Sequence, residues 1–177
     1  MRAQIERALA AGIDVTHLDT HMGAALVPEL LPATLRVALE FRLPLLLPRD
    51  IRSYLSVLNL GAVDAGVYDA AFGRLEEARM PVVERFTMTP GATPDAASYR
   101  PVLVPADPGL TFVSLHPNTP GDIEGITARH PRQNPAWRTG EHAFLASGAA
   151  DALLASEGIR RSGFRVLRDA WRRMGQT

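Results

Sequence analysis

Residues 13–47 read IDVTHLDTHMGAALVPELLPATLRVALEFRLPLLL, and this stretch predicts a strand, a helix and a second strand in succession. Apolar residues recur at helical spacing from Pro28 to Phe41, so a helix is expected there. Short apolar segments flank it and predict strands over Ile13–His21 and Leu43–Leu47. A strand that alternates with an amphipathic helix is typical of a parallel βα unit.

The rest of the chain repeats this alternation of helices and short apolar strands. The pattern predicts an α/β fold class, arranged as parallel βα units in a single domain over residues 1–177. Asn118–Thr139 is polar and is expected to be irregular. The other expected helices are Met1–Ala11, Ile51–Leu58, Val63–Arg79, Ala96–Val104, Glu141–Glu157 and Phe164–Arg173, and the other expected strands are Pro81–Met88 and Leu110–Leu115.

The number of strands is small for a closed barrel. A complete eight-stranded α/β barrel has about 250 residues, whereas this chain has 177 and supplies four or five strands. A partial barrel exposes a strand edge, and an exposed edge favours self-association. A homo-oligomer is therefore one expected state.

The composition excludes several kinds of chemistry. The chain has no cysteine, which excludes disulfides, thiolate metal sites and cysteine nucleophiles. All 19 cationic residues are arginine, so Schiff-base and P-loop lysine chemistry are excluded as well. Hydrophobic residues make up 46% of the chain, enough for a core, and the formal net charge is zero. No long-range field therefore attracts nucleic acid or an anionic membrane.

The two ends of the chain carry no signal for a membrane or for nucleic acid. Met1–Ala11 lacks the apolar core of a signal peptide. No apolar stretch approaches the roughly 18 residues of a membrane span, so no membrane span is expected and a cytoplasmic location is the default. Six arginines near the C-terminus lie beside Asp169 without interleaved aromatic residues, which favours a solvated helix face and no nucleic-acid partner. They are Arg160, Arg161, Arg165, Arg168, Arg172 and Arg173.

The segment Thr16–His21 carries the strongest chemical signal. Side chains alternate between the two faces of a strand, so His17, Asp19 and His21 are expected on one side. Two imidazoles and a carboxylate are ligands that suit a divalent metal, and one group can support another's orientation. The alternative is a polar strand face, or histidines that cap a helix.

Two further candidates follow predicted strands. The strand Leu110–Leu115 delivers His116 at its carboxyl end, where active sites of α/β barrels lie, and a histidine there can act as a general acid or base. Arg49 follows Leu43–Leu47 and can orient a substrate. The alternatives are a histidine that only ends a strand and an arginine that pairs with Asp50.

These blocks resemble the YdjC-like family of carbohydrate deacetylases. Val15–His21 resembles the family's THLDSH block, and further similarity lies in Pro44–Arg49, in Leu110–Pro117 and in the closing Glu157–Asp169. The resemblance implies a (β/α) barrel of the polysaccharide-deacetylase type. It also implies a hydrolase that acts on a C–N amide bond, removing N-acetyl groups from amino sugars or oligosaccharides with a divalent metal, magnesium or zinc.

The resemblance also assigns roles to residues of this chain. It implies that His21 is a metal ligand, that His17 and Asp19 support it, with Asp19 the one identifiable base, and that His116 is a general acid for the leaving amine. A metal would polarise the acetyl carbonyl and lower the pKa of the attacking water.

One feature of the family is missing from the sequence. The family opens with a block like NADDFG, whose aspartates bind metal and act in catalysis, and this chain has no Asp-Asp pair. The sequence therefore predicts an N-terminally truncated portion of a deacetylase, incomplete or inactive as given. The alternatives are a non-catalytic remnant that binds a sugar or a partner, and another metal hydrolase such as a phosphoesterase.

Overall fold

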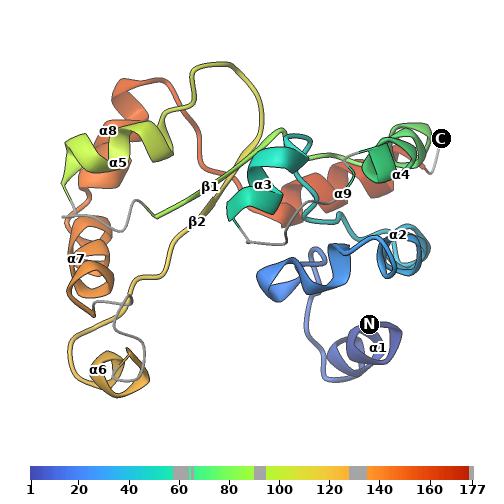
Figure 1. Cartoon of the computed structure of the whole chain (residues 1–177), viewed down its shortest axis with the longest axis horizontal. Coiled ribbons are helices and arrows are strands. Elements are labelled where there is room, and N and C mark those ends of the chain that lie inside the picture. Colours follow the sequence, from blue (N-terminus) through green and yellow to red (C-terminus); the bar gives the residue numbers. More distant parts are fainter. Residues whose placement is uncertain (58–63, 65, 90–94, 128–134, 176–177) are drawn as a thin grey trace. The chain divides into compact units, whose positions relative to one another are not determined.

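The computed structural model describes residues 1–57, 64, 66–89, 95–127 and 135–175 of the chain (Figure 1). They divide into two compact units, residues 1–85 with 162–177 and residues 86–161, which are described separately. Unit 1 contains α1 (Arg2–Ala10), η1 (His21–Leu26), α2 (Leu31–Glu40), α3 (Ile51–Val57), α4 (Gly66–Glu77) and α9 (Phe164–Met174). Unit 2 contains β1 (Arg85–Met88, whose first residue belongs to unit 1), α5 (Ala96–Leu103), β2 (Thr111–Ser114), α6 (Asp122–Thr127), α7 (Pro135–Ala146) and α8 (Ala149–Ser156).

Parallel pairing joins successive extended segments of unit 1. Leu18 forms a parallel bridge with Leu45, through bonds of 2.8 Å from the Leu18 N–H to the Pro44 carbonyl and 2.9 Å from the Leu46 N–H to the Leu18 carbonyl. A second parallel bridge joins Pro48 to Val83. Parallel neighbours require a crossover, and α2 and α4 fall within these crossovers.

The leucine run at the centre of these pairings is the buried core that the sequence predicted. Leu43, Leu45, Leu46 and Leu47 are each at most 2% exposed. A fully buried leucine side chain contributes about 1.5–3 kcal/mol to stability, so this run is a principal source of stability for unit 1. Leu43 packs in one cluster with Ile5 of α1 and Val37 of α2.

Four helices end in the same left-handed turn. The residue after the cap has a positive φ, which is 76° at Gly12, 48° at Arg42, 52° at Arg79 and 68° at Gly158. The next amide then donates to a carbonyl five residues back at 2.9–3.0 Å, which is the Schellman closure of a helix. Glycine adopts this conformation without strain, whereas an arginine side chain costs roughly 1 kcal/mol or more.

Side chains of helix α9 donate hydrogen bonds to backbone carbonyls in several connecting segments of unit 1. The Arg168 guanidinium donates to the carbonyl of Val15 at 2.7 Å and pairs with Asp14. The Trp171 indole donates to the carbonyl of Ala78 at 2.7 Å, and Arg172 donates to the carbonyls of Phe41 and Arg42.

The solvated face expected for these arginines is therefore wrong at two positions. Arg168 is only 6% exposed, and Arg172 is half-buried. The Arg168–Asp14 pair holds the pKa of the Asp14 carboxyl below its usual value. These arginines serve tertiary contacts, which the polar composition of the helix did not reveal.

Unit 2 is built from a two-stranded parallel sheet, β1 and β2, and helices (Figure 1). Helix α8 lies beside both α5 and α7. The buried core of unit 2 includes Tyr99, Leu103, Phe144 and Leu154. The α/β class is confirmed as a mixture of helices and small parallel pairings, and the described residues are mostly helical. The single domain stays a prediction.

Two expectations for residues 118–157 are wrong. Asn118–Thr139 is not irregular throughout, because α6 lies within it and α7 begins at Pro135. The single helix expected over Glu141–Glu157 is two helices, α7 and α8, because Gly148 turns left-handed with a φ of 78°. Leu58 and residues 63 and 65 of the expected helices lie outside the described residues.

None of the described helices is long and apolar enough to cross a bilayer.

The left-handed backbone of Arg79 predicts that replacement by glycine stabilises the chain there, whereas the same replacement inside α4 destabilises it. Arg79→Gly should raise the free energy of unfolding by up to about 1 kcal/mol, because glycine removes the Cβ strain. Arg74→Gly, at an exposed position inside α4, should lower it by about 1 kcal/mol. Urea unfolding of both variants measures the difference, and equal destabilisation by both would contradict the turn geometry.

Candidate functional site

His17, Asp19 and His21 line one pocket of unit 1 with a volume of about 430 Å³. The bridge between Leu18 and Leu45 fixes the strand here, and the side chains alternate after it: Asp19 is exposed and Thr20 is buried. The rest of the lining comes from α1, from η1 and from the segment itself, including Leu18 and Thr20. The three predicted residues thus meet in one pocket, and their chemical roles stay predictions.

The environment of His17 favours its neutral form. Its Nδ1 lies 2.9 Å from the Thr16 hydroxyl oxygen, and its ring stacks on Phe164, with centroids 4.1 Å apart and planes at 5°. Burial lowers the pKa of His17, and the charge of Asp19 opposes the shift. Neutral imidazole is the form that binds metals. Because Nδ1 is engaged by Thr16, a metal at His17 would use Nε2.

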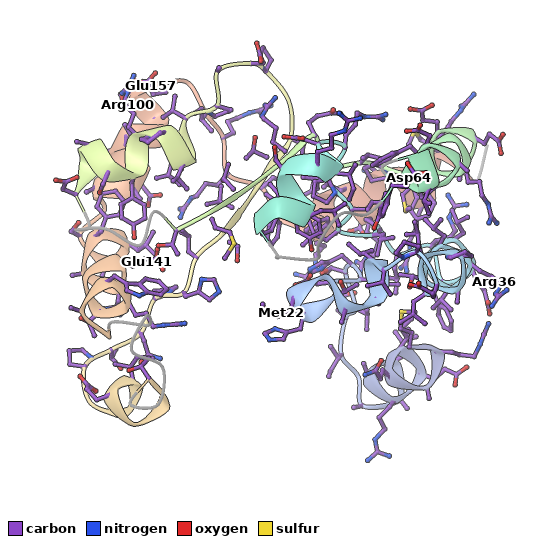
Figure 2. The ribbon with its side chains drawn as sticks, viewed as in Figure 1. Met22, Arg36, Asp64, Arg100, Glu141 and Glu157 are labelled. Carbon is purple, nitrogen blue, oxygen red and sulfur yellow. The ribbon has the colours of Figure 1, made fainter. Side chains whose placement is uncertain are left out.

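A tight, strained turn follows the Leu18 bridge, with His21 and Met22 at its two central positions; Figure 2 labels Met22. The Gly23 N–H donates to the Thr20 carbonyl at 2.8 Å. Met22 has a φ of 56° although it is not glycine, and its side chain is 61% exposed. Such backbone strain costs of order 1–3 kcal/mol and is found preferentially at functional sites.

Tyr54 of α3 is a neighbour of this block that the sequence did not identify. It is 2% exposed. Burial first, and then the charge of Asp19, raise the pKa of Tyr54 to about 12, and the nearby Thr20 hydroxyl opposes the rise. No periodic signal in the sequence connects residue 54 with residues 19 and 20, because the contact depends on how the crossover packs.

The donor atoms suit a metal in kind, but they do not converge. Two imidazoles and a carboxylate are ligands for zinc or similar ions. Within the part of the chain that the structure describes, no three His, Asp or Glu side chains are gathered as a metal-binding group. The pocket therefore supplies suitable donor chemistry without an assembled ligand set.

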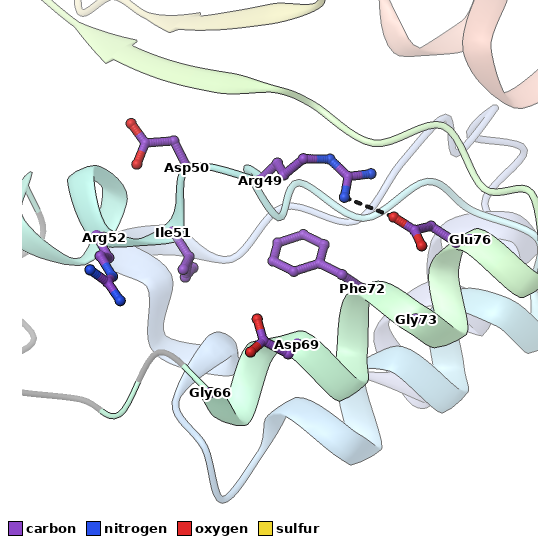
Figure 3. Close-up of a pocket in the computed structure, with 9 residues that line it drawn as sticks. All are labelled: Arg49, Asp50, Ile51, Arg52, Gly66, Asp69, Phe72, Gly73 and Glu76. Atoms are coloured by element: carbon purple, nitrogen blue, oxygen red, sulfur yellow. Dashed lines mark hydrogen bonds and ion pairs between the residues drawn. The ribbon is translucent and has the colours of Figure 1, made fainter.

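Arg49 lies in a second pocket of unit 1, of about 470 Å³, shown in Figure 3. Its guanidinium pairs with Glu76 at 2.8 Å and Glu84 at 3.4 Å, and its carbon Cζ lies 5.4 Å from the centre of the Phe72 ring. Arg49 therefore pairs with these two carboxylates, whereas the sequence suggested Asp50 as the alternative partner. Its role in substrate binding stays a prediction.

His116 belongs to unit 2 and follows β2 directly after Leu115. Its backbone N–H donates to the carboxylate of Glu141, and its ring meets the Trp137 ring edge-on, with centroids 6.0 Å apart. Glu141 was not identified from the sequence as a site residue. The signal was present, because Trp137, Glu141 and Phe144 share one helical face, but the helix was expected to begin only at Glu141.

The chain is similar to known proteins over most of its length. The model of the family described as YdjC-like protein matches residues 1–156. A carbohydrate deacetylase of Brevibacillus brevis is 34% identical over 99 residues, which are 49% of this chain. A carbohydrate deacetylase of Vibrio campbellii is 46% identical over 43 residues, or 24% of this chain. The matched parts span 40% and 17% of the lengths of those two relatives.

The environment of Tyr54 predicts a change in the alkaline stability of the chain. The folded pKa lies above the value near 10 expected when unfolded, so the folded chain retains a proton that the unfolded chain loses. The stability that this proton contributes is present below about pH 10 and is lost as the pH rises towards 12. In Tyr54→Phe the free energy of unfolding should therefore fall less steeply, by up to about 1.4 kcal/mol per pH unit.

Urea unfolding of the wild type and Tyr54→Phe at pH 8, 10 and 11 measures this difference in slope. At pH 8 Tyr54 is protonated in both the folded and the unfolded wild type, so this pH gives the baseline from which the two slopes are compared. Parallel pH dependences for the two proteins would show that Tyr54 is not held in this environment.

Proposed function

The chain belongs to the YdjC-like family, and on this premise we propose that it carries part of the active site of a carbohydrate deacetylase. The proposed reaction is hydrolysis of the N-acetyl amide of an acetylated amino sugar or oligosaccharide. The observation that carries the proposal is the single pocket lined by His17, Asp19 and His21. The two relatives are named carbohydrate deacetylases, which supports the substrate class.

The proposed architecture is a partial (β/α) barrel. In support, three of the pairings join segments in chain order: Leu18 with Leu45, Pro48 with Val83, and β1 with β2. In barrels of this kind the site residues follow the carboxyl ends of the strands. Arg49 follows the Pro48 bridge directly, His116 lies two residues after the end of β2, and His21 lies three residues after the Leu18 bridge.

We propose that His21 is a ligand of a divalent metal, and that His17 and Asp19 support it. When bound, such an ion polarises a carbonyl oxygen and lowers the pKa of a water molecule. The neutral state favoured for His17 supports this role. Asp19, exposed in the same pocket, is the proposed acceptor of the proton from the attacking water.

The departing group requires a proton as the amide C–N bond breaks. We assign this proton to His116, because an imidazole can serve as a general acid. Water adds to the acetyl carbon, the C–N bond breaks, and the products are acetate and the free amine. Arg49 is proposed to contact the carbohydrate, because guanidinium donors suit hydroxyl acceptors.

Acetate release tests this proposal. The chain is incubated with N-acetylated chitooligosaccharides in the presence of zinc or magnesium, and acetate and free amine are measured together. His116→Ala should lower kcat by about 100-fold or more if His116 is the general acid, and His21→Ala should abolish release. His142→Ala, a change of the same kind on α7, is the matched control and should retain the activity.

Two outcomes would contradict the proposal. The first is an absence of acetate release from the wild type at all metal concentrations. The second is acetate release that survives His21→Ala and His116→Ala as well as it survives the control. Hydrolysis of a phosphoester substrate by the wild type, without acetate release, would identify another class of metal hydrolase.

A further inference from the structure

Glu141 is a fully buried carboxylate within unit 2. It lies on α7 (Figure 2) and is 0% exposed. One carboxylate oxygen, Oε1, accepts a hydrogen bond of 2.6 Å from the Tyr99 hydroxyl. The other, Oε2, accepts from the backbone N–H of His116. Burial of a carboxyl group is costly unless its oxygens are hydrogen-bonded, and both oxygens of Glu141 have donors.

The two donors match a carboxylate better than an amide. A carboxylate has only acceptors, whereas a glutamine amide would turn an NH₂ group towards one of the two donors. Burial and the hydrogen bond to Glu141 hold the pKa of Tyr99 above its usual range, so Tyr99 stays protonated and remains a donor. The arrangement is therefore a fixed one, with a single hydrogen-bonding pattern.

His116 lies where the backbone leaves the sheet. Strand β2 ends at Ser114, and Pro117 has no N–H to donate. Glu141 accepts the bond of the His116 N–H, and after Pro117 the Asn118 N–H donates to the Arg138 carbonyl of α7 at 3.1 Å. Trp137, one helical turn before Glu141 on the same face of α7, meets the edge of the His116 ring. Helix α7 thus contacts both the backbone and the imidazole of this residue.

We propose that Glu141 is a positioning residue that fixes His116 at the end of β2. This inference rests on the proposed function, in which His116 gives a proton to the leaving amine. A carboxylate that holds the backbone of a general acid restricts where its ring can lie, and displacement by about 1 Å can cost about 100-fold in rate. Glu141 touches neither substrate nor metal in this role.

The test combines nuclear magnetic resonance with kinetics on Glu141→Gln. The His116 amide proton should move upfield, and its exchange with solvent should accelerate at least about tenfold, because the bond to a carboxylate is lost. In the acetate assay, kcat should fall at least about tenfold while KM changes less than about twofold. Loss of packing alone would lower the amount of folded protein without this division between kcat and KM.

Two control variants separate positioning from stability. Tyr99→Phe removes the donor to Oε1 but leaves the acceptor of the His116 N–H in place, so it should disturb the His116 amide signal and kcat clearly less than Glu141→Gln does. Glu157→Gln neutralises a carboxylate of the same unit that pairs with Arg100 at 2.7 Å. It should leave His116 unchanged.

Three results would overturn the proposal. One is a His116 amide signal that Glu141→Gln does not move. Another is Tyr99→Phe shifting the signal and kcat as strongly as Glu141→Gln does. If Glu141→Gln does not fold, the test rests on the wild type, and rapid exchange of its His116 amide proton with solvent would be the third result that overturns the inference. If the wild type releases no acetate, the proposed function fails, while the amide measurements still decide the positioning.

Discussion

The parallel pairing of successive segments is the constraint on which the described part of unit 1 depends. Leu18 pairs with Leu45, and Pro48 pairs with Val83. Strands that run in the same direction need a helical return between them, and each return must end in a turn that leads into the next strand. The turns therefore lie at the amino ends of the strands, and the residues of the candidate site follow the carboxyl ends.

This division explains why α9 belongs with unit 1 although it comes last in the chain. Its side chains donate to the carbonyls of Phe41, Arg42 and Ala78, in the turns after α2 and α4, and to that of Val15, in the segment that leads from α1 to the Leu18 bridge. Carbonyls at helix ends lack partners within the helix, so donors from elsewhere must satisfy them. Phe164, the first residue of the same helix, stacks on the His17 ring. Helix α9 therefore contacts both these backbone carbonyls and a residue that lines the pocket.

The sequence predicted the helices and buried segments that follow from the spacing of apolar residues along the chain. Helical periodicity and the leucine run predicted α2 and the buried segment after it. His17, Asp19 and His21 do line one pocket, but Leu18 and Thr20 line it as well and His21 lies in η1, so alternation along a strand does not account for the grouping. The break at Gly148 was missed because a left-handed glycine was read as a helical residue. The partners of Arg49, Arg168 and Tyr54 were missed because they depend on tertiary packing, on which spacing along the chain carries no information.

The central claim is that the pocket of His17, Asp19 and His21 binds a divalent metal through His21. Isothermal titration of the metal-free chain with zinc measures this binding most directly. The account predicts one equivalent of bound zinc in the wild type and in the control His142→Ala. His21→Ala should weaken binding at least about tenfold. Zinc binding that is absent from the wild type, or that is equal in His21→Ala, would contradict the account.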